Sequence, residues 1–190
     1  MSIYPPRIAA HFASSANAGD LTGSKVEGRS ASFVCGSFAA LSLRIEDSAI
    51  SSARFRTNGC GFMIAAADVL CEWLKGKSVT ELHGLKAAEL SATVSRPLDS
   101  FPPGRTQCAE VVFEALRHAM AEYRRQRIEE FQGEKALICT CFGVSEETIV
   151  NVIAENGLTD VDEVSDLCRA GAGCGSCRML IAELIDSQAE

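Results

Sequence analysis

Apolar and polar residues alternate along the stretch FAALSLRIEDSAISSARFRTN, residues 38–58. The alternating positions are Leu41, Leu43 and Ile45 before the turn residues EDS, and Ala53, Phe55 and Thr57 after them. A period of two is typical of strands that bury one face. Two such runs separated by a short polar turn predict an antiparallel hairpin over this stretch.

Two other stretches repeat their apolar residues with helical spacing. FMIAAADVLCEWLKG, residues 62–76, follows Gly-Cys-Gly and ends in Lys-Gly, which is typical of a helix C-terminus. A second helix is predicted from about Thr106 to Arg127, directly after Pro102 and Pro103, which disfavour helix. Upstream, residues 1–27 are rich in Ser, Ala and Gly. They give only a weak helical signal around residues 8–12, so we expect this segment to be partly mobile.

Three short helices are predicted in the last sixty residues. Ser145 is a good N-cap for the first, which ends at Gly157. Thr159 caps the second, which ends near Arg169, and Cys177 begins the third. A helical domain of this size has a thin core and usually needs a cross-link such as a bound metal.

Composition and charge narrow the class of protein. A content of 47% hydrophobic and 23% charged residues indicates a globular chain. Residues 1–130 carry a net charge of +1 and residues 131–190 a net charge of −8, so there is no basic stripe of the kind that nucleic acid requires. The sequence offers no apolar run long enough for a membrane span and no secretion signal. We therefore expect a soluble cytoplasmic protein that binds neither nucleic acid nor membrane.

Nine cysteines stand out in the composition, and an odd number without a secretion signal argues against a disulfide framework. Four of them form two close pairs, CxC and CxxC: Cys139, Cys141, Cys174 and Cys177. Four thiolates suit tetrahedral zinc or an iron-sulfur cluster, and not magnesium or calcium. The neighbouring glycines let backbone amides approach the sulfurs, which favours a cluster over structural zinc.

Three further cysteines, Cys35, Cys60 and Cys108, each lie at the edge of a predicted element beside small or turn-forming residues. Such positions suit metal binding or thiol chemistry. The spacing of the three cysteines alone is equally consistent with a chance arrangement. Cys71 falls in the middle of a predicted helix and is interpreted as a packed core residue. Cys168 is also interpreted as a packed residue. A less favoured interpretation is that it serves as an alternative metal ligand.

Several longer motifs resemble known families. VCGS at 34–37, ARFRTNGCGFMIAAADVLCEWLKGKSVTEL at 53–82 and PPGRTQCAEVVFEALRHAMAEYRRQ at 102–126 resemble the IscU-type scaffold domain. CxCFGV, NGLTDVDEV and AGAGCGSC resemble the 2Fe-2S domain of bacterioferritin-associated ferredoxin (BFD) and of NifU. The whole resembles NifU without its C-terminal CxxC module. The resemblance implies an α+β fold in which a small antiparallel sheet packed with helices, residues 1–130, precedes a small all-α BFD-like domain, residues 134–190.

The resemblance also implies a function. In this family the N-terminal domain builds a transient 2Fe-2S or 4Fe-4S cluster on three cysteines, here Cys35, Cys60 and Cys108. A cysteine desulfurase supplies the sulfur, and apo-proteins receive the cluster. The second domain keeps a permanent redox-active 2Fe-2S cluster, here on Cys139, Cys141, Cys174 and Cys177, which an electron donor reduces. The family is typically homodimeric, and a scaffold is not expected to be an enzyme that turns over a small molecule.

Three departures from the family pattern keep alternatives open. Ser37 stands where scaffold domains usually have aspartate, Gln107 where they usually have histidine, and FPPGR where they usually have LPPVK, the loop that a dedicated chaperone reads. One alternative is a 2Fe-2S electron carrier or redox sensor whose scaffold domain is degenerate. Another is a zinc-stabilised interaction module, with zinc as a substitute for the cluster.

Overall fold

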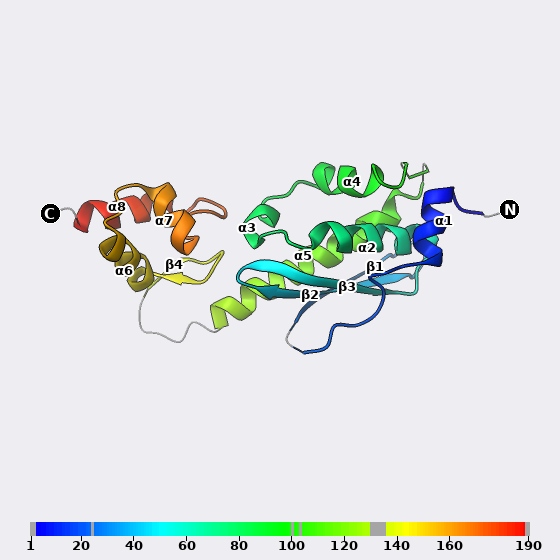
Figure 1. The fold of residues 1–190 in the computed structure, drawn as a ribbon, viewed down its shortest axis with the longest axis horizontal. Helices are drawn as coiled ribbons and strands as arrows, with labels where there is room; N and C mark the ends of the chain where they lie inside the picture. Colours follow the sequence, from blue (N-terminus) through cyan, green and yellow to red (C-terminus); the bar gives the residue numbers. More distant parts are fainter. Residues whose placement is uncertain (1–2, 24, 100, 103, 130–135, 189–190) are drawn as a thin grey trace. The chain divides into compact units, whose positions relative to one another are not determined.

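The structure is a computed structural model that describes residues 3–23, 25–99, 101–102, 104–129 and 136–188 (Figure 1). It divides into two compact units, Met1–Glu122 and Tyr123–Glu190. The domain boundary predicted between residues 130 and 134 lies outside the described residues. Within them, no helix has the length and apolar character that a membrane span requires.

The first unit combines helices with a three-stranded antiparallel sheet of order β1-β2-β3 (Figure 1). Its elements are α1 (Pro6–Ala13), β1 (Val26–Ala31), β2 (Phe38–Glu46), β3 (Ala49–Thr57), α2 (Gly61–Leu74), α3 (Val79–Leu82), α4 (Ala87–Ser95) and most of α5 (Thr106–Glu129), which crosses the division after Glu122. The predicted hairpin is confirmed by β2 and β3, in which Leu41 lies opposite Phe55 and Leu43 opposite Ala53. The two long predicted helices are confirmed by α2 and α5.

The helix-facing side of the sheet forms the core of this unit. Leu41, Leu43, Ala53 and Phe55 are buried there. On β1 the backbone of α5 comes so close that a Cβ on Gly28 would lie 2.1 Å from Ala115 O and Ala119 N. Only glycine fits at this position, because any side chain would displace the helix backbone. This contact fixes α5, and with it Cys108, against the sheet.

Much of the N-terminal segment packs against α2, whereas the expectation that residues 1–27 are partly mobile stays a prediction. The weak helical signal corresponds to α1, whose Ile8 is fully buried. The carboxylate of Asp68 in α2 is 3% exposed and accepts hydrogen bonds from His11 Nδ1 at 2.8 Å and from Asn17 N at 2.9 Å. A buried carboxylate requires such donors, and here the N-terminal segment supplies them. Sequence periodicity carries no sign of a partnership between residues so far apart.

The second unit contains helices and one short ribbon. Its elements are β4 (Leu137–Cys139), β5 (Val144–Ser145), α6 (Glu146–Asn156), α7 (Val161–Cys168) and α8 (Arg178–Gln188). The three predicted helices are confirmed, whereas the prediction of an all-α domain missed the antiparallel ribbon β4-β5. Strands of three and two residues are too short to show a period. The N-cap of α7 is Asp160 rather than Thr159, because Asp160 Oδ1 accepts Asp162 N at 2.7 Å.

Replacing Gly28 by alanine tests the contact between α5 and β1. The added Cβ would overlap helix backbone, so Gly28→Ala lowers the free energy of unfolding of the first unit by about 2 kcal/mol or more. Urea unfolding of the full chain, followed by circular dichroism, measures the change. The control is Ala31→Ser at the exposed end of the same strand, which changes stability by less than about 0.5 kcal/mol. Equal stability of both variants would contradict this packing.

Candidate metal centres

Local backbone structure sets the positions of the three separate cysteines. Cys35 is exposed in the turn between β1 and β2, Cys60 is the N-cap of α2, and Cys108 lies buried in the first turn of α5. In the turn, the Ser32 hydroxyl accepts hydrogen bonds from Val34 N at 3.2 Å and Cys35 N at 3.4 Å. Serine therefore fixes the turn that presents the exposed thiol to solvent.

The structure brings these three thiols into one neighbourhood. Cys60 Sγ lies 3.7 Å from Cys108 Sγ, and the thiolate charge of Cys35 acts on Cys108. Among the described residues, no three His, Cys, Asp or Glu side chains are already arranged to hold a metal ion. The three-cysteine ligand set therefore stays a prediction, supported by one thiol contact and one electrostatic interaction.

Within this three-cysteine site, the exposed thiol of Cys35 and the buried thiol of Cys108 differ sharply in pKa. A hydrogen bond from the Ser37 hydroxyl, with one from Ser32, lowers the pKa of Cys35 to about 7. Burial, with the neighbouring thiolate of Cys60, raises the pKa of Cys108 to about 12. At neutral pH, Cys35 is thus partly a nucleophilic thiolate, whereas Cys108 ionises readily only when a cation binds.

The four remaining site cysteines lie in two regions of the second unit. Cys139 ends β4, Cys141 lies in the turn between β4 and β5, and Cys174 and Cys177 lie between α7 and α8. Cys141 Sγ donates to Cys174 Sγ at 3.4 Å, and the thiols of Cys139 and Cys177 are hydrogen-bonded to each other. Each member of the CxC pair therefore meets one member of the CxxC pair.

The backbone around these sulfurs fits a bound group. A Cβ on Gly173 would lie 2.9 Å from Cys141 Cβ and 3.1 Å from Cys141 Sγ, so only glycine leaves this sulfur in place. The donor set consists of four soft thiols, of which Cys139 and Cys177 are buried and Cys174 is exposed. Such a set fits an iron-sulfur cluster or tetrahedral zinc.

The second site repeats the ionisation pattern of the first. A hydrogen bond from the Ser176 hydroxyl, with one from its backbone amide, lowers the pKa of Cys174 to about 7. Burial, with the neighbouring Cys139 thiolate, raises the pKa of Cys177 to about 11. In both sites the low-pKa thiol begins a Cys-Gly-Ser tripeptide whose glycine has a positive φ, +70° at Gly36 and +77° at Gly175.

Sequence reasoning missed the hydroxyls and one cation. It treated Ser37 only as a missing aspartate, although the repeated Cys-Gly-Ser tripeptide was a signal that could have revealed its role. It also missed Arg105, whose charge helps to lower the pKa of Cys35 and offsets part of the rise in the pKa of Cys108. From the sequence, the FPPGR loop that contains Arg105 is distinguished only by its departure from a family motif.

The other two cysteines lie apart from these roles. Cys71 is fully buried, which confirms its prediction as a core residue. Cys168 is half-buried and donates a hydrogen bond to Val164 O at 3.2 Å. Burial raises the pKa of the Cys168 thiol, and the charge of Cys139 raises it further.

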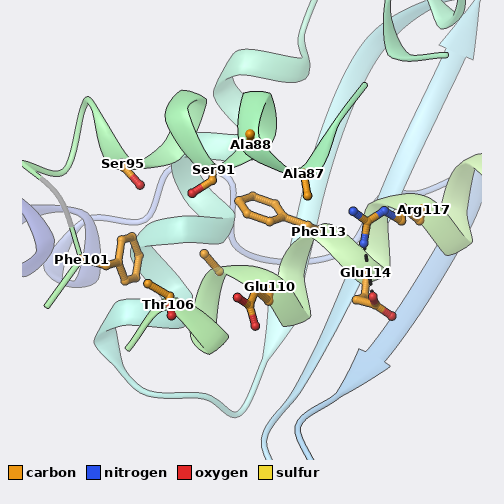
Figure 2. Close-up of a pocket in the computed structure, with 11 residues that line it drawn as sticks. Ala87, Ala88, Ser91, Ser95, Phe101, Thr106, Glu110, Phe113, Glu114 and Arg117 are labelled. Carbon is orange, nitrogen blue, oxygen red and sulfur yellow. Dashed lines mark hydrogen bonds and ion pairs between the residues drawn. The ribbon is translucent and has the colours of Figure 1, made fainter. Parts of the chain in front are cut away.

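A separate cavity of about 440 Å³ lies between α4 and α5. Figure 2 shows Phe113 inside it, Phe101 and Thr106 towards one end, and the ion pair of Glu114 with Arg117 towards the other. None of its lining residues is a cysteine. The cavity adjoins the loop that leads to Cys108 but holds no candidate metal ligand of the three-cysteine site.

Comparison with known proteins decides the family. The model of the NifU-like N-terminal domain matches residues 3–130, more than half of the chain. The chain belongs to the NifU-like N-terminal domain family. The model of the BFD-like [2Fe-2S] binding domain matches residues 137–187, the segment that carries the four-cysteine site. The resemblances drawn from the motifs are thereby confirmed for both segments.

Relatives of this NifU-like chain include proteins of two lengths. It is 35% identical over 162 residues to the nitrogen fixation protein NifU of Nostoc sp., covering 83% of this chain and 53% of that protein. It is 30% identical to the iron-sulfur cluster assembly scaffold protein IscU of Rickettsia prowazekii, covering 65% of this chain and 94% of that one. The chain thus spans about half the length of the curated NifU relatives. A solved N-terminal NifU-like structure from Brucella abortus aligns with a TM-score of 0.49 at 17% identity, over 68% of this chain and 96% of that one.

Removing the Ser37 hydroxyl tests the cause of the low Cys35 pKa. In Ser37→Ala the thiolate loses a hydrogen-bond donor, so its pKa rises from about 7 towards the ~8.5 of a free thiol. The thiolate fraction at neutral pH then falls. The pH dependence of Cys35 alkylation by iodoacetamide, read by peptide mass spectrometry, measures the shift. Cys174 in the same chain is the internal control, and an unchanged Cys35 midpoint would refute the role of the hydroxyl.

Adding a methyl group at Gly173 tests the fit of the four-cysteine site. Gly173→Ala pushes Cys141 away from Cys174, so the second unit binds its metal about tenfold more weakly. Competition with a chelator, followed by metal content per chain, measures this affinity. Ala172→Ser in the same loop is the control and keeps wild-type affinity. If both variants retain metal equally, Gly173 is not required by the site.

Proposed function

We propose that this protein is an iron-sulfur cluster assembly scaffold that builds a transient cluster on Cys35, Cys60 and Cys108 and transfers it to apo-proteins. The observation that carries the proposal is the 3.7 Å contact between Cys60 Sγ and Cys108 Sγ, with the charge of Cys35 acting on Cys108. Membership of the NifU-like family and similarity to a protein named as a cluster scaffold support it. Thiolates serve this role as both sulfur acceptors and iron ligands.

Exposure of one ligand supports a transient cluster at this site. Cys35 stands on a turn between two strands and is exposed, whereas Cys108 is 4% exposed. A cargo cluster must enter and leave, and an exposed ligand on a turn gives a partner protein access to the cluster. The iron and sulfur held there are the substrate of assembly and are not a resident cofactor.

The second unit is proposed to hold a permanent [2Fe-2S] cluster on Cys139, Cys141, Cys174 and Cys177. The match to a [2Fe-2S] binding domain and the fit of its loop around Cys141 support this assignment. Two of these ligands are buried, which limits access by chelators and acceptors. A cluster bound there supplies one-electron transfer. The chain's own residues orient the sulfurs and favour the thiolate form of Cys174.

The proposal implies a set of partners. A cysteine desulfurase supplies sulfur, apo-iron-sulfur proteins receive the cluster, and an electron donor reduces the cluster of the second unit. We further propose that the chain acts as a homodimer in the cytoplasm. It is a scaffold without turnover of a small-molecule substrate.

A second candidate function is an electron carrier or redox sensor whose first unit serves only for docking. The observation that favours it is the pair of neutral side chains, Ser37 and Gln107, at positions where scaffold domains usually carry ionisable ones. Ser37 holds the Cys35 thiolate but offers no carboxylate to iron, and Gln107 is a poorer ligand than histidine. Cluster transfer distinguishes the two functions.

Anaerobic reconstitution of the full chain with iron, cysteine and a cysteine desulfurase tests the proposal. The wild type binds two clusters, of which one passes to an apo-ferredoxin and one remains. Cys60→Ala abolishes the transferable cluster and leaves the retained one, because it removes one of the three proposed ligands. Iron, acid-labile sulfide and ferredoxin absorbance measure both fractions, with Cys71→Ala as the control for loss of a thiol outside the sites.

The hypothesis of an electron carrier or redox sensor predicts the opposite result for this experiment. It requires one cluster per chain, the same stoichiometry in Cys60→Ala, and no transfer to apo-ferredoxin. Transfer that persists in Cys60→Ala would reject the proposed ligand set.

A further inference from the structure

Arg105 is held between the two helices that carry Cys60 and Cys108. Its guanidinium carbon lies 5.5 Å from the ring centroid of Phe62, two residues after Cys60. Its backbone carbonyl accepts a hydrogen bond from Cys108 N at 3.0 Å. A guanidinium over an aromatic face is held by the cation-π interaction. The cation is therefore fixed at the three-cysteine site by contacts at both ends of the residue.

The aromatic platform under Arg105 is itself firmly packed. The Phe62 ring contacts Tyr4 edge-on, with centroids 5.2 Å apart, and Phe101, with centroids 6.0 Å apart. The ring of Tyr4 also covers Gly61, and its hydroxyl accepts the Gly61 amide at 3.1 Å. These contacts tie Phe62 to the N-terminal segment and to the loop that begins α5. Arg105 thus sits on a platform with a defined position.

The charge of Arg105 is available to the thiols. Within the described part of the chain it forms no ion pair with a carboxylate. The contacts with Phe62 and with Cys108 N place Arg105 at this site, and its charge interacts with both Cys35 and Cys108. An exposed guanidinium near the thiols of Cys35 and Cys108 creates a local attraction for small anions.

A scaffold needs such an attraction for its sulfur source. Persulfides are anionic near neutral pH, and the thiolate that must attack them is anionic as well, so the two repel each other. A nearby cation offsets this repulsion, whereas it would oppose the entry of iron. The position of Arg105 therefore suits the sulfur-accepting step better than the iron-binding step.

We propose that Arg105 is the anion-binding residue of the three-cysteine site and that its ligand is a persulfide anion. This inference rests on the proposed scaffold function. In the step that it assists, the Cys35 thiolate attacks the terminal sulfur of R–S–S⁻, the S–S bond breaks, and R–S⁻ leaves. The product is a Cys35 persulfide anion, so atoms, charge and electrons balance without a further reactant.

Paired alkylating reagents test the anion site directly on the metal-free full chain. Iodoacetate is an anion and iodoacetamide is neutral, and both react by thiolate attack on the CH₂ carbon with loss of iodide. The ratio of their rates at Cys35 therefore cancels the thiolate fraction. In Arg105→Gln this ratio falls about fivefold, the loss of roughly one exposed charge interaction. Arg105→Lys keeps most of the ratio, and added salt lowers it in the wild type but hardly in Arg105→Gln.

The chain offers matched controls for this experiment. Cys174 is another exposed thiol with a pKa of about 7, so its reagent ratio stays constant in every variant. Arg117→Gln removes a guanidinium from the same helix α5 that is paired with Glu114, and leaves the Cys35 ratio unchanged. Circular dichroism spectra that match the wild type show that each variant is folded.

Sulfur uptake from glutathione persulfide links the anion site to the proposed ligand. The rate of Cys35 persulfide formation, read by mass spectrometry and divided by the Cys35 thiolate fraction, falls in Arg105→Gln by the same factor as the reagent ratio. An unchanged ratio, an equal change at Cys174, or unimpaired sulfur uptake in Arg105→Gln would overturn the inference. These readouts need no cluster. Failure of the wild type to assemble and transfer a cluster would reject the scaffold function instead, and would leave the reagent ratio unaffected.

Discussion

Thiols that are gathered around one point repel each other as they ionise, and both candidate centres are built around this constraint. Burial and a neighbouring thiolate raise the pKa of Cys108 to about 12 and that of Cys177 to about 11. A polycationic iron centre relieves such repulsion, because it stabilises every thiolate around it. Each site also contains one exposed thiol that ionises near pH 7, Cys35 or Cys174, held by the serine of a Cys-Gly-Ser tripeptide. In each site, one thiol ionises easily and the buried thiols do not. The ionised thiol can therefore bind the first iron or sulfur before the buried thiols must lose their protons.

The remainder of each unit positions these sulfurs. In the first unit, Gly28 lets the backbone of α5 rest on β1, and the N-terminal segment completes the buried shell around Asp68 in α2. The helices that carry Cys60 and Cys108 are thereby fixed, while Cys35 stays on an exposed turn. In the second unit, the absence of a side chain at Gly173 lets the two cysteine loops meet. Each site has one exposed thiol, but the four-cysteine site has two buried ligands, Cys139 and Cys177, where the three-cysteine site has one, Cys108. This difference supports the proposal of one transient and one retained cluster.

Elements with long periodic patterns could be predicted from the sequence, and those stabilised by distant partners could not. The hairpin β2-β3 and helices α2, α5 and α6 show their period over at least nine residues. By contrast, β1 has a glycine where α5 packs, and β4 and β5 are too short to show alternation. The cysteine spacing of the second unit singled out its four thiols, whereas grouping the other three relied on family resemblance. Ser37 and the FPPGR loop were noted as departures from a family pattern, but the roles of Ser37 and Arg105 were not predicted, because they arise from geometry around a turn and over an aromatic ring.

The most direct measurement of the central claim is the metal content and visible spectrum of the full chain purified without oxygen. The account predicts a brown protein with at least about two iron ions and matching acid-labile sulfide per chain. It further predicts absorbance bands typical of sulfide-to-iron charge transfer and little zinc. A colourless protein with zinc in the second unit and no iron would contradict the account and would identify the four cysteines as a structural zinc site.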